Sequence, residues 1–142
     1  MRLAAVRFYF DADVLGLAHI VAAQRSDATY PGDQGATVHK RTRPSCPITD
    51  PDRDDHAWIP VVTAEGWLII TRDRHIREHR AEIDAVRTSG ARMVVFSGAD
   101  AGGTWEQLEV LMRQWRKIEA LRARKGPLIV LATRTTLTDL PL

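Results

Sequence analysis

The stretch that decides the fold runs from Arg7 to Gly16 and reads RFYFDADVLG. Its three consecutive aromatic residues predict a buried strand, which ends in two acids, Asp11 and Asp13. Asp13 is suited to cap the helix that VLGLAHIVAA predicts, but a cap does not explain Asp11. Ligands of open α/β folds bind at the carboxyl ends of the strands. The stretch therefore fits either a helix cap or a metal or phosphoryl site.

The composition is that of a soluble globular protein. The chain has 142 residues, 44% of them hydrophobic, and a net charge of +2, so residues 1–142 are expected to form a single domain. The single cysteine, Cys46, excludes an internal disulfide and a cysteine zinc cluster. With no run of about 20 apolar residues and no signal-peptide pattern, we expect a cytoplasmic protein without membrane contact.

Short, continuous apolar runs alternate with helical patterns along the chain. Such runs are typical of strands buried on both faces, as in parallel sheets. The pattern predicts an α/β fold with a mainly parallel β-sheet flanked by helices. The expected strands cover residues 4–10, 67–71, 92–96 and 127–132, and the expected helices cover 13–25, 76–89 and 104–125, with a further helix beginning at 54.

Two segments carry more specific predictions. Thr104 and Gln107 have the spacing of a capping box, and the apolar stripe that follows, which includes Trp105 and Met112, should face the core. All four tryptophans fall on apolar patterns and are expected in the core. Residues 26–53 hold four of the seven prolines and predict a long functional loop, with one short strand near 36–40.

The acids occur in three places, each at an expected strand or helix end. Asp11 and Asp13 follow the first strand, Asp54 and Asp55 open a helix, and Asp73 follows the strand at 67–71. If the two strands are neighbours, these carboxylates converge on one sheet edge and would repel one another without a cation. Oxygen ligands of this kind suit Mg²⁺ or Mn²⁺. Asp13 and either Asp54 or Asp55 could instead be helix caps.

The sequence resembles the PIN-domain nucleases, and especially the compact PIN-like branch that includes VapC-type toxins. The resemblance is carried by residues 6–13 and by DDHAWIPVVTAEGWLIITRDRHIR, residues 54–77, in which Thr71 and Asp73 form a Thr-x-Asp element. It implies a metal-dependent endoribonuclease, the toxin of a toxin–antitoxin pair. By position, it implies that Asp11, Asp55 and Asp73 are catalytic and that Thr71 supports the pocket.

The family pattern often includes a further acid, usually a glutamate, between the first strand and the later acids. This chain has no glutamate before Glu65, so Asp13 or Asp33 is the candidate for that position. Basic residues near the acids and in the loop are candidates for RNA binding: Arg72, Arg74, Arg77, Lys40, Arg41 and Arg43. The expected partners are RNA, a cognate antitoxin and a second copy of the chain.

Three other interpretations compete with a nuclease. A haloacid-dehalogenase-like phosphatase would use Asp11 as nucleophile and Asp13 as general acid. It would also need a lysine followed by a pair of acids late in the chain, and Asp139 is the one acid in that part of the sequence. A receiver domain would need a lysine followed by proline after its last strand. A catalytically degenerate PIN fold would bind RNA or protein without cutting. His75 and His79 share an expected helix face, yet a zinc site is not expected there because a third nitrogen or sulfur ligand is missing.

Overall fold

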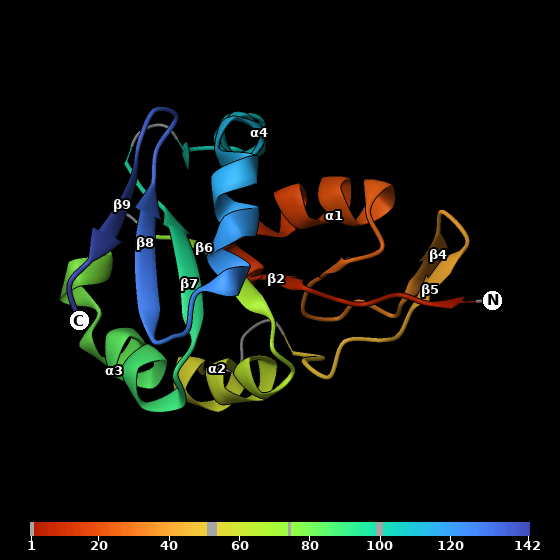
Figure 1. Ribbon diagram of the computed structural model, residues 1–142, viewed down its shortest axis with the longest axis horizontal. Coiled ribbons are helices and arrows are strands. Elements are labelled where there is room, and N and C mark those ends of the chain that lie inside the picture. The colour runs from red at the N-terminus through yellow and green to blue at the C-terminus, as the bar shows by residue number, and fades with distance from the viewer. Residues whose placement is uncertain (1, 51–53, 74, 99–100) are drawn as a thin grey trace.

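The computed structural model describes residues 2–50, 54–73, 75–98 and 101–142. Its strands and helices alternate along the chain, as the apolar runs predict (Figure 1). The strands are β1 (Arg2–Leu3), β2 (Phe8–Phe10), β3 (Ala28–Thr29), β4 (Ala36–Val38), β5 (Arg41–Arg43), β6 (Leu68–Arg72), β7 (Arg92–Phe96), β8 (Leu128–Ala132) and β9 (Leu137–Leu140). The α-helices are α1 (Leu15–Gln24), α2 (Asp55–Ala64), α3 (Arg80–Ser89) and α4 (Thr104–Ala120), and the short 3-10 helices are η1 (Ala12–Val14), η2 (Ile76–Glu78) and η4 (Leu121–Ala123).

The main sheet has the strand order β3-β2-β6-β7-β8-β9. Every pair is parallel except β8 with β9, which is antiparallel. The four strands that the sequence predicts are therefore neighbours in this sheet. The α/β class with a mainly parallel sheet is confirmed. In particular, β2 and β6 lie side by side, with Phe10 opposite Ile70, so the acids that follow both strands emerge at the same edge.

Helices cover both faces of this sheet, and each face has its own hydrophobic core. Phe8 and Phe10 point to the face covered by α1 and α4, while Tyr9 points to the face covered by α2 and α3. Figure 1 shows the two helix layers above and below the strands. Because both faces are covered, β2, β6, β7 and β8 are apolar along nearly their whole length.

The segment 26–53 contains more regular structure than predicted. It contributes β3 to the main sheet, and β4 and β5 form a hairpin that joins β1 in a three-stranded sheet. At the hairpin tip, His39 and Lys40 have φ values of 50° and 64°, as a two-residue turn of this twist requires. The buried Arg43 pairs with Asp33, its Nε lying 2.7 Å from Asp33 Oδ2, and ties the hairpin to the preceding loop.

Several predicted boundaries are wrong. The strand expected at 4–10 is shorter, because residues 4–7 cross from the small sheet to the main one. The helix expected at 76–89 is interrupted at His79, whose φ of −95° and ψ of 74° are not helical. It ends at Gly90 with φ 75°, as predicted. The antiparallel strand β9 was not predicted, since its sequence LTDL has little apolar signal.

The start of α4 also differs from the prediction. Its N-cap residue is Gly103, and Gln107 donates a hydrogen bond to the carbonyl of Ala101 at 3.2 Å, so no capping box forms with Thr104. The apolar stripe faces the core only in part. The side chains of Trp105 and Met112 are exposed, whereas Trp58 and Trp67 are buried as expected and Trp115 is partly buried. Within the described residues, no helix is both long and apolar enough to cross a membrane.

Candidate active site

Asp11 and Asp13 lie at the carboxyl end of β2, against the end of β6. The backbone N–H of Asp11 donates to the carbonyl of Ile70 at 2.9 Å, which extends the strand pairing by one residue. The chain then turns into η1, where Asp11 Oδ1 accepts a hydrogen bond from the N–H of Ala12 at 2.6 Å. This turn sends both carboxylates toward Thr71, as the expected strand order requires.

Thr71 connects the two carboxylates. Its buried hydroxyl lies 3.1 Å from Asp11 Oδ2 and 2.9 Å from Asp13 Oδ1. A hydroxyl carries a single proton, so it donates to one carboxylate at a time. The remaining repulsion between the acids requires a proton or a cation near them. The geometry agrees with the pocket-supporting position of Thr71.

Asp55 reaches the same region from the first turn of α2. Its Oδ1 accepts a hydrogen bond from Trp58 Nε1 at 2.9 Å, which fixes one side of the carboxylate and leaves the other oxygen available. Asp54 occupies the N-cap position, but it is exposed and its side chain makes no capping bond. Of this pair, Asp55 acts electrostatically on Asp11 and Glu82 and so belongs to the acidic cluster. The alternative that Asp54 caps the helix through its side chain is wrong.

Asp73 follows β6 and is held by two groups from the next turn. The backbone N–H of His75 donates to Asp73 Oδ1 at 2.8 Å, and the imidazole Nδ1 of His79 contacts Asp73 Oδ2. The same Nδ1 lies 3.9 Å from Glu82 Oε2. Asp73, His79 and Glu82 can each offer one ligand atom, with these atoms all within 4.8 Å of one another. The two histidines do not act together, because the helix is broken between them.

Glu82 is the residue that the sequence interpretation missed. It lies on α3, later in the chain than the position that the family pattern gives to a further acid, and the residue is only 8% exposed. Its one sequence signal is its spacing from Val86, which puts an acid on the buried face of the helix. Asp33, one of the two proposed substitutes, is engaged with Arg43 instead. The cluster therefore consists of five acids: Asp11, Asp13, Asp55, Asp73 and Glu82.

Burial and mutual repulsion hold protons on this cluster. Burial, followed by the charges of Asp55 and Asp73, raises the pKa of Glu82 to about 8. Burial also raises the pKa of Asp11 to about 6, and burial together with the charge of Asp11 raises that of Asp13 to about 7. Asp13 is the most exposed of these three acids, so solvent weakens its repulsion by the neighbouring carboxylates more than it does for Asp11 or Glu82. Acids so arranged bind either protons or a cation at neutral pH.

The five acids lie in a segment of the chain that matches a known protein family. A family model described as "PIN like domain" matches residues 7–98, which contain all five acids. The chain belongs to the PIN-like domain family. PIN domains are generally nucleases and typically use divalent metals, whereas the match does not separate a VapC-type branch from others. No curated protein and no solved structure matches the chain significantly.

The donor atoms of the PIN-like domain fit a divalent metal. Carboxylate oxygens suit Mg²⁺ and Mn²⁺, and Asp11, Asp13 and Glu82 have the raised pKa values of acids whose charge lacks compensation. The imidazole of His79 adds a nitrogen donor, which favours a first-row transition ion over Mg²⁺. The residues that would hold the ion are Asp73, His79 and Glu82, whose ligand atoms lie within 4.8 Å of one another, and Asp11, Asp13 and Asp55 add nearby negative charge.

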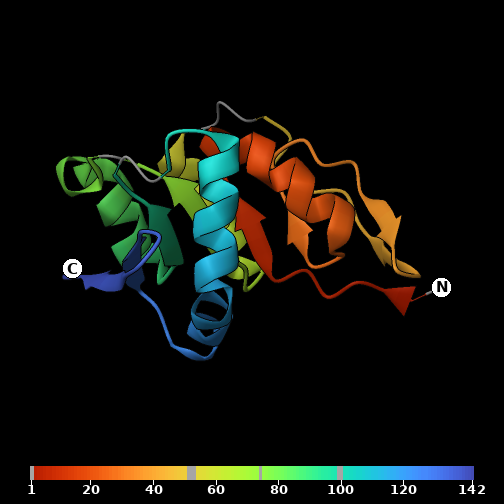
Figure 2. The same ribbon diagram turned by 90° about the horizontal axis from the view of Figure 1, so that it is seen from above.

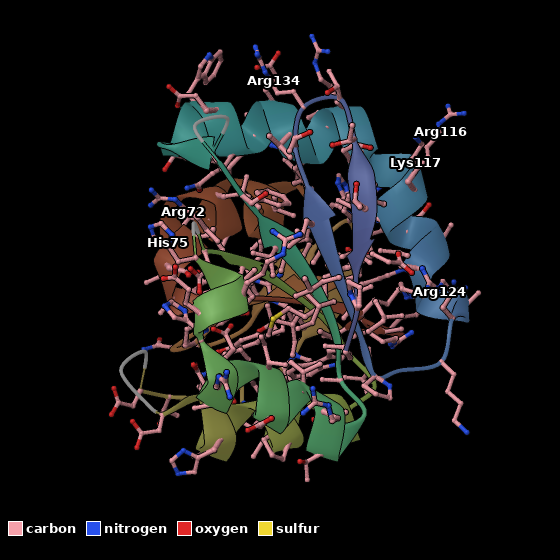
Figure 3. All side chains as sticks on the ribbon, turned by 90° about the vertical axis from the view of Figure 1, so that its left-hand side faces the viewer. Arg72, His75, Arg116, Lys117, Arg124 and Arg134 are labelled. Atoms are coloured by element: carbon pink, nitrogen blue, oxygen red, sulfur yellow. The ribbon has the colours of Figure 1, made fainter. Side chains whose placement is uncertain are left out.

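The basic residues expected to bind RNA divide into four groups. Arg72 contacts Asp13 through its backbone, and Arg77 lines a hollow together with Asp73. Figure 3 shows Arg72 next to His75 at one edge of the molecule. Arg74 lies outside the described residues. Lys40 and Arg41 are exposed on the β4–β5 hairpin. The expectation for Arg43 is wrong, because its guanidinium is buried in the pair with Asp33 and cannot reach a phosphate.

Proposed function

We propose that this PIN-like domain is a metal-dependent endoribonuclease that uses Mg²⁺ or Mn²⁺. The observation that carries the proposal is the convergence of five acids from β2, η1, α2, β6 and α3 on one sheet edge, with the pKa of Glu82 at about 8. A bound cation would supply charge neutralisation and a nucleophilic water for phosphodiester hydrolysis. The acids would hold that cation, and the hydroxyl of Thr71 holds the carboxylates of Asp11 and Asp13 in place.

Arg72 supports a phosphate-containing substrate. Its backbone N–H donates to Asp13 Oδ1 at 3.3 Å, so the residue is anchored at the cluster. Its side-chain Nε is buried and has no hydrogen-bond partner among the described residues. The residue as a whole is only partly buried, so the terminal nitrogens of its guanidinium, rather than the buried Nε, would bind a phosphate oxygen. Arg77, exposed on η2, would extend this contact along the RNA backbone.

A phosphatase of the haloacid-dehalogenase type is less well supported. It would place a lysine at the two aspartates, but Lys117 lies on the exposed side of α4, far from Arg72 in Figure 3. The late acid, Asp139, pairs with Arg124 at 2.8 Å. The two groups that the phosphatase reaction needs are thus outside the acidic cluster.

The test of the proposal uses Asp55→Asn, with Asp54→Asn as its matched control. Asparagine keeps an oxygen for the bond from Trp58 and serves equally well near a helix N-terminus, so the fold should be unchanged. Losing the charge should abolish cleavage of single-stranded RNA in the presence of Mn²⁺, while Asp54→Asn should cut at the wild-type rate. Full activity of Asp55→Asn would refute the mechanism. A wild type that binds RNA but never cuts it would support the degenerate binding module instead.

We further propose that the protein acts in the cytoplasm as the toxin of a toxin–antitoxin pair. The support is the resemblance of residues 54–77 to the VapC-type branch. The test is genetic: a small open reading frame for a DNA-binding protein should adjoin the gene, and its expression should relieve growth arrest caused by this protein. Arrest that the neighbouring protein leaves unchanged would contradict the assignment.

A further inference from the structure

A hollow of about 380 Å³ lies at the opposite end of β2 from the acids, where the end of α1 meets the β4–β5 hairpin. Figure 2 shows the hairpin beside the end of α1, on the side of the molecule away from α3. Arg7 directly precedes β2 and Asp11 directly follows it, so at about 3.3 Å per residue their backbones are roughly 13 Å apart. We call this hollow the hairpin pocket. Its charged and ionisable lining residues are Arg7, Arg25, Asp27, His39 and Arg41.

Two arginines give the hairpin pocket an uncompensated positive charge. Arg7 and Arg41 are exposed, and within the described residues neither side chain takes part in an ion pair or a hydrogen bond. Arg25 is compensated, because its guanidinium donates to both carboxylate oxygens of Asp27, at 2.9 and 2.8 Å. Asp27 is the one acid among the described lining residues, and Glu119, outside the lining, lies 3.8 Å from Arg25 as well. The charges of Arg7 and Arg41 therefore remain available to an anion.

Neutral hydrogen-bonding groups complete the lining of the hairpin pocket. The hydroxyl of Ser26, which is partly buried, has no hydrogen-bond partner among the described residues and is free to donate. His39 Nε2 lies 3.1 Å from the backbone carbonyl of Gln24, and because a carbonyl oxygen can only accept, Nε2 donates. This bond holds the hairpin tip against the end of α1. Among the described lining residues Ala5 alone is apolar, so the pocket suits a small hydrophilic anion and offers no apolar wall for a nucleobase.

We propose that the hairpin pocket binds a phosphomonoester group, carried either by a free mononucleotide or by the 5′ end of an RNA chain. The guanidinium groups of Arg7 and Arg41 bind the phosphate oxygens, since the planar fork of arginine matches the geometry of phosphate. The hydroxyl of Ser26 donates a further hydrogen bond. The remainder of the ligand stays outside the pocket, in contact with solvent.

Charge and shape favour a phosphomonoester over an internal phosphodiester of RNA. A phosphomonoester carries a charge of about −1.5 to −2 at pH 7, which balances the two arginines, whereas a phosphodiester carries a single charge. A terminal phosphate can also enter a hollow end-on, while an internal one must leave room for the chain on both sides. The pocket is separate from the acidic cluster, so binding there requires neither a divalent metal nor cleavage.

The first test measures binding of adenosine 5′-monophosphate by calorimetry in EDTA, with adenosine as the probe that lacks the phosphate. Arg7→Gln and Arg41→Gln should each weaken binding of the monophosphate by about tenfold or more, because each removes a charged donor. Arg2→Gln is the matched control: Arg2 is exposed opposite Arg41 on β1 but does not line the pocket, so the affinity should change by less than about twofold. No binding of the monophosphate, equal binding of adenosine, or wild-type affinity in both pocket variants would overturn the proposal.

The second test identifies the source of the phosphate. Two single-stranded RNAs of the same sequence, labelled at the 3′ end and carrying either a 5′-phosphate or a 5′-hydroxyl, are compared by fluorescence anisotropy in EDTA. If the ligand is an RNA end, the 5′-phosphorylated RNA should bind more tightly, and Arg7→Gln should remove the preference. Equal affinities, together with binding of the monophosphate, would assign the pocket to a free mononucleotide. A preference that persists in Arg7→Gln/Arg41→Gln would overturn the proposal. Because EDTA excludes cleavage, failure of the nuclease proposal would leave both tests unaffected.

Discussion

Replacing Glu82 with glutamine should make the metal-free protein more stable at pH 8, although the residue is buried in the active site. Glutamine has nearly the same shape but carries no charge, so it removes one of the five acids without opening a cavity. The folded protein raises the pKa of Glu82 from 4.5 to about 8. Folded chains thus bind this proton more tightly than unfolded chains, and the charged form opposes folding.

The sign and the size of the effect follow from that difference. Because the folded-state pKa is the higher one, stability is greatest below pH 4.5 and declines as the pH rises toward 8. At about 1.4 kcal/mol per pKa unit, the shift corresponds to roughly 4–5 kcal/mol. The neighbouring acids also exchange protons with Glu82, so we expect a gain of about 2–4 kcal/mol for Glu82→Gln at pH 8. At pH 4.5 or below, the variant and the wild type should be similarly stable.

The assay is urea unfolding in EDTA between pH 4.5 and 8.5. The control is Glu65→Gln, an exposed glutamate at the end of α2, which should show no such dependence on pH. With saturating Mn²⁺, the order should reverse, since the wild type gains binding energy that the variant lacks. Equal stability of Glu82→Gln and the wild type at pH 8, or a loss in EDTA, would refute the account of the cluster.

Three further substitutions test other contacts. Thr71→Val should destabilise the protein by about 1–3 kcal/mol at neutral pH, because it removes the hydroxyl shared by the acids; unchanged urea unfolding would contradict this. Arg43→Met should cost about 3–5 kcal/mol by leaving Asp33 buried without its partner, and it should not alter RNA affinity measured on the folded protein. His79→Ala should weaken Mn²⁺ binding more than Mg²⁺ binding in calorimetric titrations, because an imidazole nitrogen favours Mn²⁺ as its metal. Equal losses of affinity for the two ions would contradict this role of His79.

The sheet and most of the acids could be predicted from the sequence because their signals are local. Buried parallel strands leave continuous apolar runs, and the end of such a run fixes the sheet edge at which Asp11 and Asp73 emerge. The prediction that these two acids lie at the same sheet edge depended on one assumption, that β2 and β6 are neighbours, and the two strands do pair. Asp55 follows from its place at the start of a helix.

The remaining features depend on tertiary contacts that the sequence does not display. Glu82 looks like an ordinary helix-surface acid until α3 packs against the sheet and turns it inward. Arg43 appears to belong to a basic run, but the fold of the hairpin buries it against Asp33. Trp105 and Met112 continue an apolar stripe, yet the core ends before reaching them, because α4 contacts the sheet along only part of its circumference.

The central claim is that the acids hold a divalent cation. The most direct test compares Mn²⁺ binding to the wild type with Mn²⁺ binding to a variant that lacks two of the acids. Titrated at pH 7.5, the wild type should bind Mn²⁺ with a clear rise in melting temperature. Asp11→Asn/Asp73→Asn should show neither the binding nor the rise, while remaining folded in EDTA. A wild type without any Mn²⁺ response, or a double variant whose response equals that of the wild type, would contradict the account.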